Sequence, residues 1–118
     1  MSTIISVTLS TADPAKLAAF YQQATGYEVI HESADAVYLA GPDGVRLGFD
    51  RVDGFQPPPW SSDQLPALRL DVTADDLHDD EARLLALGAA RPGHTRDTDG
   101  WIFLADPDGH VFCLTSVY

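Results

Sequence analysis

The feature that most constrains the fold of this chain is an internal repeat. Each half begins with a strand-like segment, continues with an amphipathic helix that a glycine ends, and finishes with further strand-like segments. A Pro-Asp-Gly turn precedes the last of these segments in both halves, within Gly41–Gly44 and Asp106–Gly109. Because helix, terminating glycine and turn recur in the same order, a coincidence of two common turns does not explain the pattern. The sequence therefore predicts two β-α-β-β-β modules, residues 1–53 and 65–118, within a single domain, residues 1–118.

In the first module the helix has clear boundaries. Asp13 is followed by Pro14, as at a helix N-cap and first helical position, and Gly26 stands where glycine commonly ends a helix. Apolar residues recur between them at helical spacing. The predicted strands are Ile4–Leu9, Tyr27–His31, Ala36–Ala40 and Val45–Asp50.

The second module repeats this organisation after a linker. The linker, residues 54–64, contains Pro57–Pro59, which keep the backbone extended and out of any helix. Asp75 and Asp76 then cap the expected helix, and Gly88 ends it. The predicted strands are Leu68–Val72, Ala89–Arg91, Trp101–Leu104 and Val111–Thr115.

Composition places the chain among ordinary globular domains. Of its 118 residues 45% are hydrophobic and 21% charged, and the formal net charge is −11. That charge argues against nucleic acid and anionic membranes as partners, and it either steers a cationic ligand or only keeps the protein soluble. No apolar run approaches the roughly 18 residues of a membrane span, and the N-terminus lacks the features of a signal peptide. A single cysteine, Cys113, favours the cytoplasm.

The predicted strands alternate between apolar and polar side chains. Ile5, Val7 and Leu9 share one face of the first strand, and the amphipathic helices are the available cover for such faces. The opposite faces are polar, so they are either solvated or line a cleft. In a cleft, arginine can hold a carboxylate or phosphate and aspartate an amine, which leaves the charge of a ligand open. The candidate ligand-binding residues are Tyr38, Arg46, Asp50, Trp60, Arg69, Asp71 and Trp101.

Several motifs carry a resemblance to a known family. They are Ala12–Pro14 with Phe20–Tyr21, Gly26–Val29, Leu70–Val72, Asp75–Leu77, Leu87–Ala89 and Asp106–Leu114. On these residues nearly the whole chain resembles the vicinal-oxygen-chelate superfamily, and in particular its glyoxalase-like and bleomycin-resistance-like members. The resemblance implies an α+β fold in which two curved mixed sheets surround a cleft and helices cover the outer face. It also implies association into a homodimer.

Metal-using members of that superfamily carry four ligands, usually His or Glu, on the first and last strands of the two modules. The corresponding residues here are Ser6, Gly48, Arg69 and Cys113. Glycine has no donor side chain and arginine is a permanent cation, so we expect no metal at this place. No pair of histidines has the spacing of a ready metal clamp, which predicts no alternative metal site. The histidines are His31, His78, His94 and His110.

These observations favour a protein that binds or sequesters a small molecule in the cleft, without metal or other cofactor and without catalysis. Two alternatives stay open. One is a lyase, dioxygenase or isomerase of the same superfamily, using a metal or, without one, Asp50, Asp71 or His94 as acid or base. The other is an interaction module that binds no small ligand. The partners we expect are a small molecule of unidentified structure and a second copy of the chain.

Overall fold

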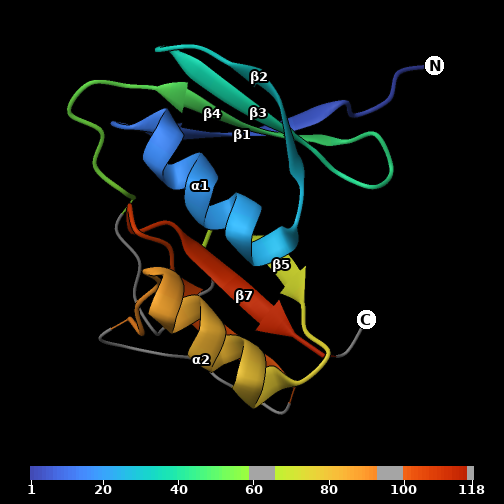
Figure 1. Ribbon diagram of the computed structural model, residues 1–118, viewed down its shortest axis with the longest axis vertical. Helices are drawn as coiled ribbons and strands as arrows, with labels where there is room; N and C mark the ends of the chain where they lie inside the picture. The colour runs from blue at the N-terminus through green and yellow to red at the C-terminus, as the bar shows by residue number, and fades with distance from the viewer. Residues whose placement is uncertain (59–65, 93–99, 117–118) are drawn as a thin grey trace. The chain divides into compact units, whose positions relative to one another are not determined.

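The computed structural model describes residues 1–58, 66–92 and 100–116, and this part of the chain has two helices and two mixed sheets (Figure 1). The predicted α+β class is thereby confirmed. The chain divides into two compact units, Met1–Phe55 and Gln56–Tyr118. The elements of the first unit are β1 (Ser6–Thr11), α1 (Pro14–Thr25), β2 (Glu28–Glu32), β3 (Ala36–Ala40) and β4 (Arg46–Arg51). Those of the second are β5 (Leu70–Thr73), α2 (Leu77–Leu87), β6 (Trp101–Ala105) and β7 (Val111–Thr115).

The first unit is a four-stranded sheet with one helix on it. Its strand order is β1-β4-β3-β2, with β1 parallel to β4 and the other neighbours antiparallel. Helix α1 packs on one face, where the ring of Tyr21 stacks on that of Phe49 with centroids 5.6 Å apart. The buried apolar side chains of this core are Leu17, Ala18, Phe20, Tyr21, Val37, Leu39, Leu47 and Phe49.

The predicted boundaries of the first helix are confirmed. The Asp13 side chain accepts a hydrogen bond from the backbone N–H of Lys16 at 3.2 Å, which satisfies one of the donors that a helix start leaves unpaired. At the other end Gly26 has φ 78°, a left-handed conformation that a side chain would disfavour.

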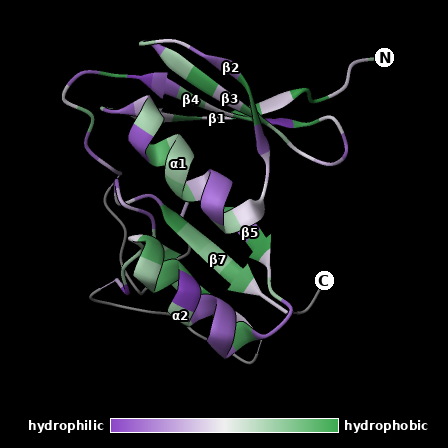
Figure 2. Cartoon of the chain, viewed as in Figure 1, coloured by the Kyte–Doolittle hydropathy of each residue, from purple (hydrophilic) through white to green (hydrophobic). Residues whose placement is uncertain are grey.

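The second unit has a three-stranded sheet in the order β5-β7-β6, with β5 parallel and β6 antiparallel to β7. Helix α2 packs against β7, and its Leu84 is 1% exposed. Asp76 caps this helix by accepting the backbone N–H of Asp79 at 3.0 Å, and Gly88 follows its last turn. Figure 2 shows hydrophobic residues along β7 and hydrophilic ones over much of α2, as expected of a helix that buries only one stripe.

The two Pro-Asp-Gly turns have the same backbone hydrogen bonds. In the first, the N–H of Gly41 donates to the carbonyl of Val45 at 3.0 Å and that of Gly44 to Gly41 at 3.3 Å. In the second, Asp106 donates to His110 and Gly109 to Asp106, both at 2.9 Å. The repeat that the sequence shows is therefore also a repeat of local structure.

Three of the strand predictions depart most from the structure. The first strand begins two residues later than expected, so Ile5, which we placed on a buried face, is 66% exposed. Likewise Leu68 lies before β5 and is 77% exposed. Ala89–Arg91 forms no strand, because only Ala90 bridges to Ala105. In the part of the chain that the structure describes, neither helix has the length and apolarity needed to cross a bilayer.

Candidate functional site

The polar face of the first sheet centres on Tyr38 and Gly48. These two residues are partners in the register of β3 and β4, and Thr8 is the partner of Gly48 on β1. The Tyr38 ring lies across the glycine, since a β-carbon added to Gly48 would stand 2.5 Å from Cε1 and 2.8 Å from Cδ1 of that ring. The same β-carbon would lie 3.0 Å from Oγ1 of Thr8. Residue 48 therefore has to be glycine for the ring to lie where it does.

Two polar residues contact the Tyr38 side chain. Its hydroxyl donates to the Oδ1 atom of Asp50 at 3.4 Å, a long hydrogen bond at an exposed position. The ring of His31 lies 5.9 Å from that of Tyr38 between centroids, at an angle of 57°. His31 reaches this place through a register shift in β2 between Val29 and His31, which makes it the partner of Tyr38.

Arg46 lies on the same face of the first sheet but one pair further along. It is the partner of Ser6 on β1 and of Ala40 on β3, and it is exposed. The structure therefore brings Tyr38 and Asp50 into contact. Arg46 lies on the same face, opposite Ala40 rather than Tyr38. Trp60, also predicted for the site, lies outside the described residues, as does His94.

Beside the second sheet, Arg69 directly precedes β5 rather than lying within it, as the predicted strand Leu68–Val72 had placed it. Its Nε atom donates to Oδ1 of Asp71 at 2.8 Å, and the side chains are 24% and 26% exposed. Its guanidinium carbon lies 5.9 Å from the centroid of the Trp101 ring and 5.6 Å from that of Phe103, which allows cation–π attraction to both. The structure thus brings three of the predicted residues together and adds Phe103, which is only 4% exposed.

Cys113 lies under this group. It is the strand partner of Asp71 on one side and of Phe103 on the other, and it is fully buried. Its Sγ atom is 3.9 Å from the carbonyl oxygen of Leu114, the contact of a weak donor. Among the residues that the structure describes, no three His, Cys, Asp or Glu side chains gather as metal ligands would.

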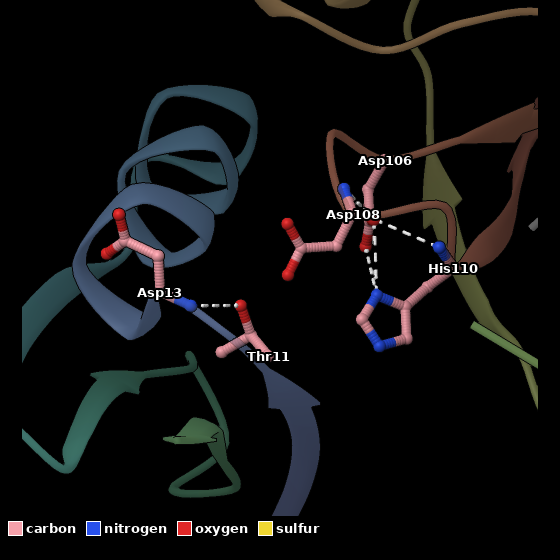
Figure 3. Close-up of polar contacts among 5 residues, drawn as sticks. All are labelled: Thr11, Asp13, Asp106, Asp108 and His110. Carbon is pink, nitrogen blue, oxygen red and sulfur yellow. Dashed lines mark hydrogen bonds and ion pairs between the residues drawn. The ribbon is translucent and has the colours of Figure 1, made fainter. Parts of the chain in front are cut away.

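Two polar clusters at element ends are structural (Figure 3). In one, Oγ1 of Thr11 accepts the backbone N–H of Asp13 at 3.0 Å just before α1. In the other, Oδ1 of Asp106 accepts the backbone N–H of Asp108 at 2.9 Å and of His110 at 3.0 Å. The Asp106 side chain is fully buried, and its Oδ2 is 3.1 Å from Nδ1 of His110. The Asp106 carboxylate therefore satisfies the backbone of the turn.

With this geometry established, comparison with known proteins identifies the family. The model of the family described as "Glyoxalase-like domain" matches residues 6–115. The chain belongs to the glyoxalase-like domain family. It is thus a member of the vicinal-oxygen-chelate superfamily, as the sequence motifs predicted. None of the curated proteins compared with this glyoxalase-like chain matches it.

Solved structures show the same fold at low sequence identity. A glyoxalase/bleomycin resistance protein/dioxygenase family enzyme from Burkholderia phytofirmans has a TM-score of 0.73 and 19% identity, covering 99% of this chain and all of that one. The fosfomycin resistance protein FosX from Listeria monocytogenes has a TM-score of 0.74 and 20% identity, covering 100% and 93%. A FosX mutant complexed with Mn(II) and 1S,2S-dihydroxypropylphosphonic acid has a TM-score of 0.75 and 21% identity, covering 100% and 94%.

Two residues of these polar faces were not among the predicted site residues. Phe103 was detectable, because strand alternation from Trp101 places it on the same face two positions later. His31 was not, because its place opposite Tyr38 depends on a register shift that no local sequence signal marks.

Proposed function

We propose that this glyoxalase-like domain binds a small organic molecule without a divalent metal and does not transform it. The observation that supports this proposal is the chemistry of the four residues that correspond to family metal ligands. These residues are Ser6, Gly48, Arg69 and Cys113. Each of the four is unsuited to coordination for a physical reason of its own.

At residue 48 the obstacle is steric as well as chemical. Gly48 offers no donor atom, and the Tyr38 ring covers the space into which any side chain from that residue would extend. A ligand side chain such as Glu would have to displace the ring and break its hydrogen bond with Asp50. The residue and its neighbour are thus adapted to each other rather than to an ion.

At residue 69 the obstacle is electrostatic. Arg69 brings a permanent positive charge to a partly enclosed place, where it is held by Asp71 and two aromatic rings. Such a charge repels a divalent cation, and the repulsion is strong where water is scarce. Of the remaining two residues, Ser6 has only a neutral hydroxyl, and the Cys113 thiol is fully buried beside a backbone carbonyl. The donor set does not fit Zn²⁺ or Mn²⁺.

A binding screen with metal analysis tests this proposal. The purified protein is screened by thermal shift against cationic glycopeptides, small acids and aromatic metabolites, and hits are confirmed by isothermal titration calorimetry before and after dialysis against EDTA. We expect at least one compound to stabilise the fold by mass action, with a Kd that EDTA leaves unchanged. Elemental analysis that finds a divalent transition metal in stoichiometric amount, or a screen without any binder, would contradict the proposal.

We also propose that the protein is a homodimer. Ile4 and Ile5 are 77% and 66% exposed where the chain enters β1, an edge strand of the first sheet. Adjacent apolar side chains at a sheet edge favour association. Light scattering after size exclusion should give twice the 12.7 kDa chain mass, and Ile5→Lys should lower it. A monomer at every concentration would contradict this proposal without affecting that of small-molecule binding.

A further inference from the structure

We infer that Arg69 anchors an oxyanion, a carboxylate or a phosphonate, as the charged group of the bound small molecule. The inference rests on the proposed binding function and settles the sign of charge that the sequence leaves open.

Within the described part of the chain, a hydrogen bond engages one edge of the Arg69 guanidinium. The group has five N–H donors, and Asp71 engages the one on Nε. Among the residues that the structure describes, none accepts a hydrogen bond from the two terminal nitrogens. Those nitrogens present paired N–H groups in one plane, the arrangement that matches the two oxygens of a carboxylate or phosphonate.

The surroundings strengthen such a contact. Trp101 and Phe103 lie close to the guanidinium, and about three-quarters of the Arg69 side chain is shielded, since 24% is exposed. A hydrogen bond between ions is stronger where neighbouring groups exclude water. The ion pair with Asp71 and the two rings also hold the side chain in one place before a ligand arrives, which reduces the entropy that binding costs.

A second arginine provides an internal comparison. Arg51 also donates from Nε to an aspartate two residues later, Asp53, at 3.0 Å. Those side chains are 48% and 87% exposed, as in an ordinary surface ion pair. The two pairs share their chemistry and spacing and differ in enclosure. Arg51 is therefore a matched control.

Asp71 acts as a positioning residue. Its Oδ1 atom already accepts from Arg69, which offsets much of its charge. The alternative anchor would be the second oxygen of this carboxylate, binding an amine. The net charge of −11 favours amines in general, so selection of an anion has to come from the local guanidinium. The experiment therefore compares anionic and cationic probes that share one ring.

The test is calorimetric titration of the full chain with benzoate, phenylphosphonate, benzyl alcohol and benzylamine. We expect the two anions to bind and the alcohol and amine to bind at least about ten-fold more weakly, because a charge-assisted pair is lost. Arg69→Met should weaken benzoate binding by about ten-fold to a hundred-fold, and Arg51→Met should change it by less than about two-fold. Arg69→Lys keeps the charge but lacks the paired N–H edge, so it should give an intermediate loss.

The outcomes separate this inference from the proposed function. If benzylamine or benzyl alcohol binds as tightly as benzoate, the oxyanion assignment is overturned and metal-free binding stays intact. The same holds if Arg69→Met does not weaken the binding of benzoate. If none of the four probes binds, the oxyanion inference is wrong. The broader screen then decides whether the protein binds any small molecule. Circular dichroism checks that each variant folds; should Arg69→Met not fold, the Arg69→Lys titration decides.

Discussion

The ring of Tyr38 lies so close over Gly48 that residue 48 has no room for a β-carbon. Such an atom would approach Cε1 of the ring to 2.5 Å, well inside van der Waals contact. Glycine in the middle of a strand is otherwise unfavourable, because it gains flexibility on unfolding and leaves nothing to pack. Gly48 is nevertheless buried in β4, which means that the aromatic ring provides the packing that its own side chain would have supplied.

Replacing this glycine should have an effect that depends on Tyr38. Gly48→Ala in the otherwise unchanged protein should lower the free energy of unfolding by about 1–3 kcal/mol, as overpacking does. In a Tyr38→Ala background the same change should cost little or stabilise by about 0.5–1 kcal/mol, the usual advantage of Ala over Gly in a strand. Urea unfolding of the four proteins measures the difference; an equal cost in both backgrounds would show that the ring is not the obstacle.

The buried Asp106 carboxylate should matter far more for stability than the exposed Asp43 carboxylate of the first Pro-Asp-Gly turn. Asp106→Ala leaves two backbone N–H groups and the His110 ring without their acceptor, and we expect a loss of about 2–4 kcal/mol. Asp43→Ala, in the matching Pro-Asp-Gly turn, changes an exposed side chain and should cost less than about 0.5 kcal/mol. Similar midpoints for the two variants in thermal unfolding would rule out this stabilising role of the Asp106 carboxylate.

The ion pairs of Arg69 and Arg51 should differ in their contribution to folding. Asp71→Asn weakens a partly enclosed pair and should lower the free energy of unfolding by about 0.5–1.5 kcal/mol at low salt. Asp53→Asn affects a largely exposed pair and should have no measurable effect. Urea titrations at low and high NaCl check both, and an Asp53 effect as large as that of Asp71 would contradict the difference in enclosure.

Helix α2 should depend on a single leucine for its packing. Leu84 is the buried residue of this helix at 1% exposed, whereas its neighbour Leu85 is 37% exposed. Leu84→Ala should cost about 2–5 kcal/mol through lost burial and the cavity that it leaves. Leu85→Ala should cost less than about 1 kcal/mol. Chemical denaturation measures the free energy of unfolding of both variants. Equal losses would mean that α2 packs differently from the structure.

Features encoded by a few adjacent residues were predictable from the sequence. Asp13 with Pro14 marks the start of α1 and Gly26 its end, because capping and left-handed backbone are local properties. The two Pro-Asp-Gly turns were predictable for the same reason, and their repetition supplied the fold class. Among the residues that we predicted for the polar faces, Tyr38 contacts Asp50 and Arg69 contacts Asp71.

Features that depend on pairing between strands were not predictable. Ala89–Arg91 has strand-like residues, yet only Ala90 finds a partner, since pairing is decided by what lies alongside. Ile5 and Leu68 continue an apolar alternation beyond the paired residues, so hydrophobicity alone placed them wrongly in the core. The overlap of Tyr38 with Gly48 could not be foreseen either, because a glycine in sequence does not reveal which ring lies on it.

The register shift in β2 affects how readily copies of this protein can pair through that strand in concentrated solution. Strand β2 is an outer edge of its sheet, all five of its residues are exposed, and they include the apolar Val29 and Ile30. A foreign strand adding there would need an evenly spaced row of N–H and C=O groups, and the extra residue between Val29 and His31 breaks that row. We therefore expect the irregularity that brings His31 to Tyr38 to oppose the addition of further strands at this edge.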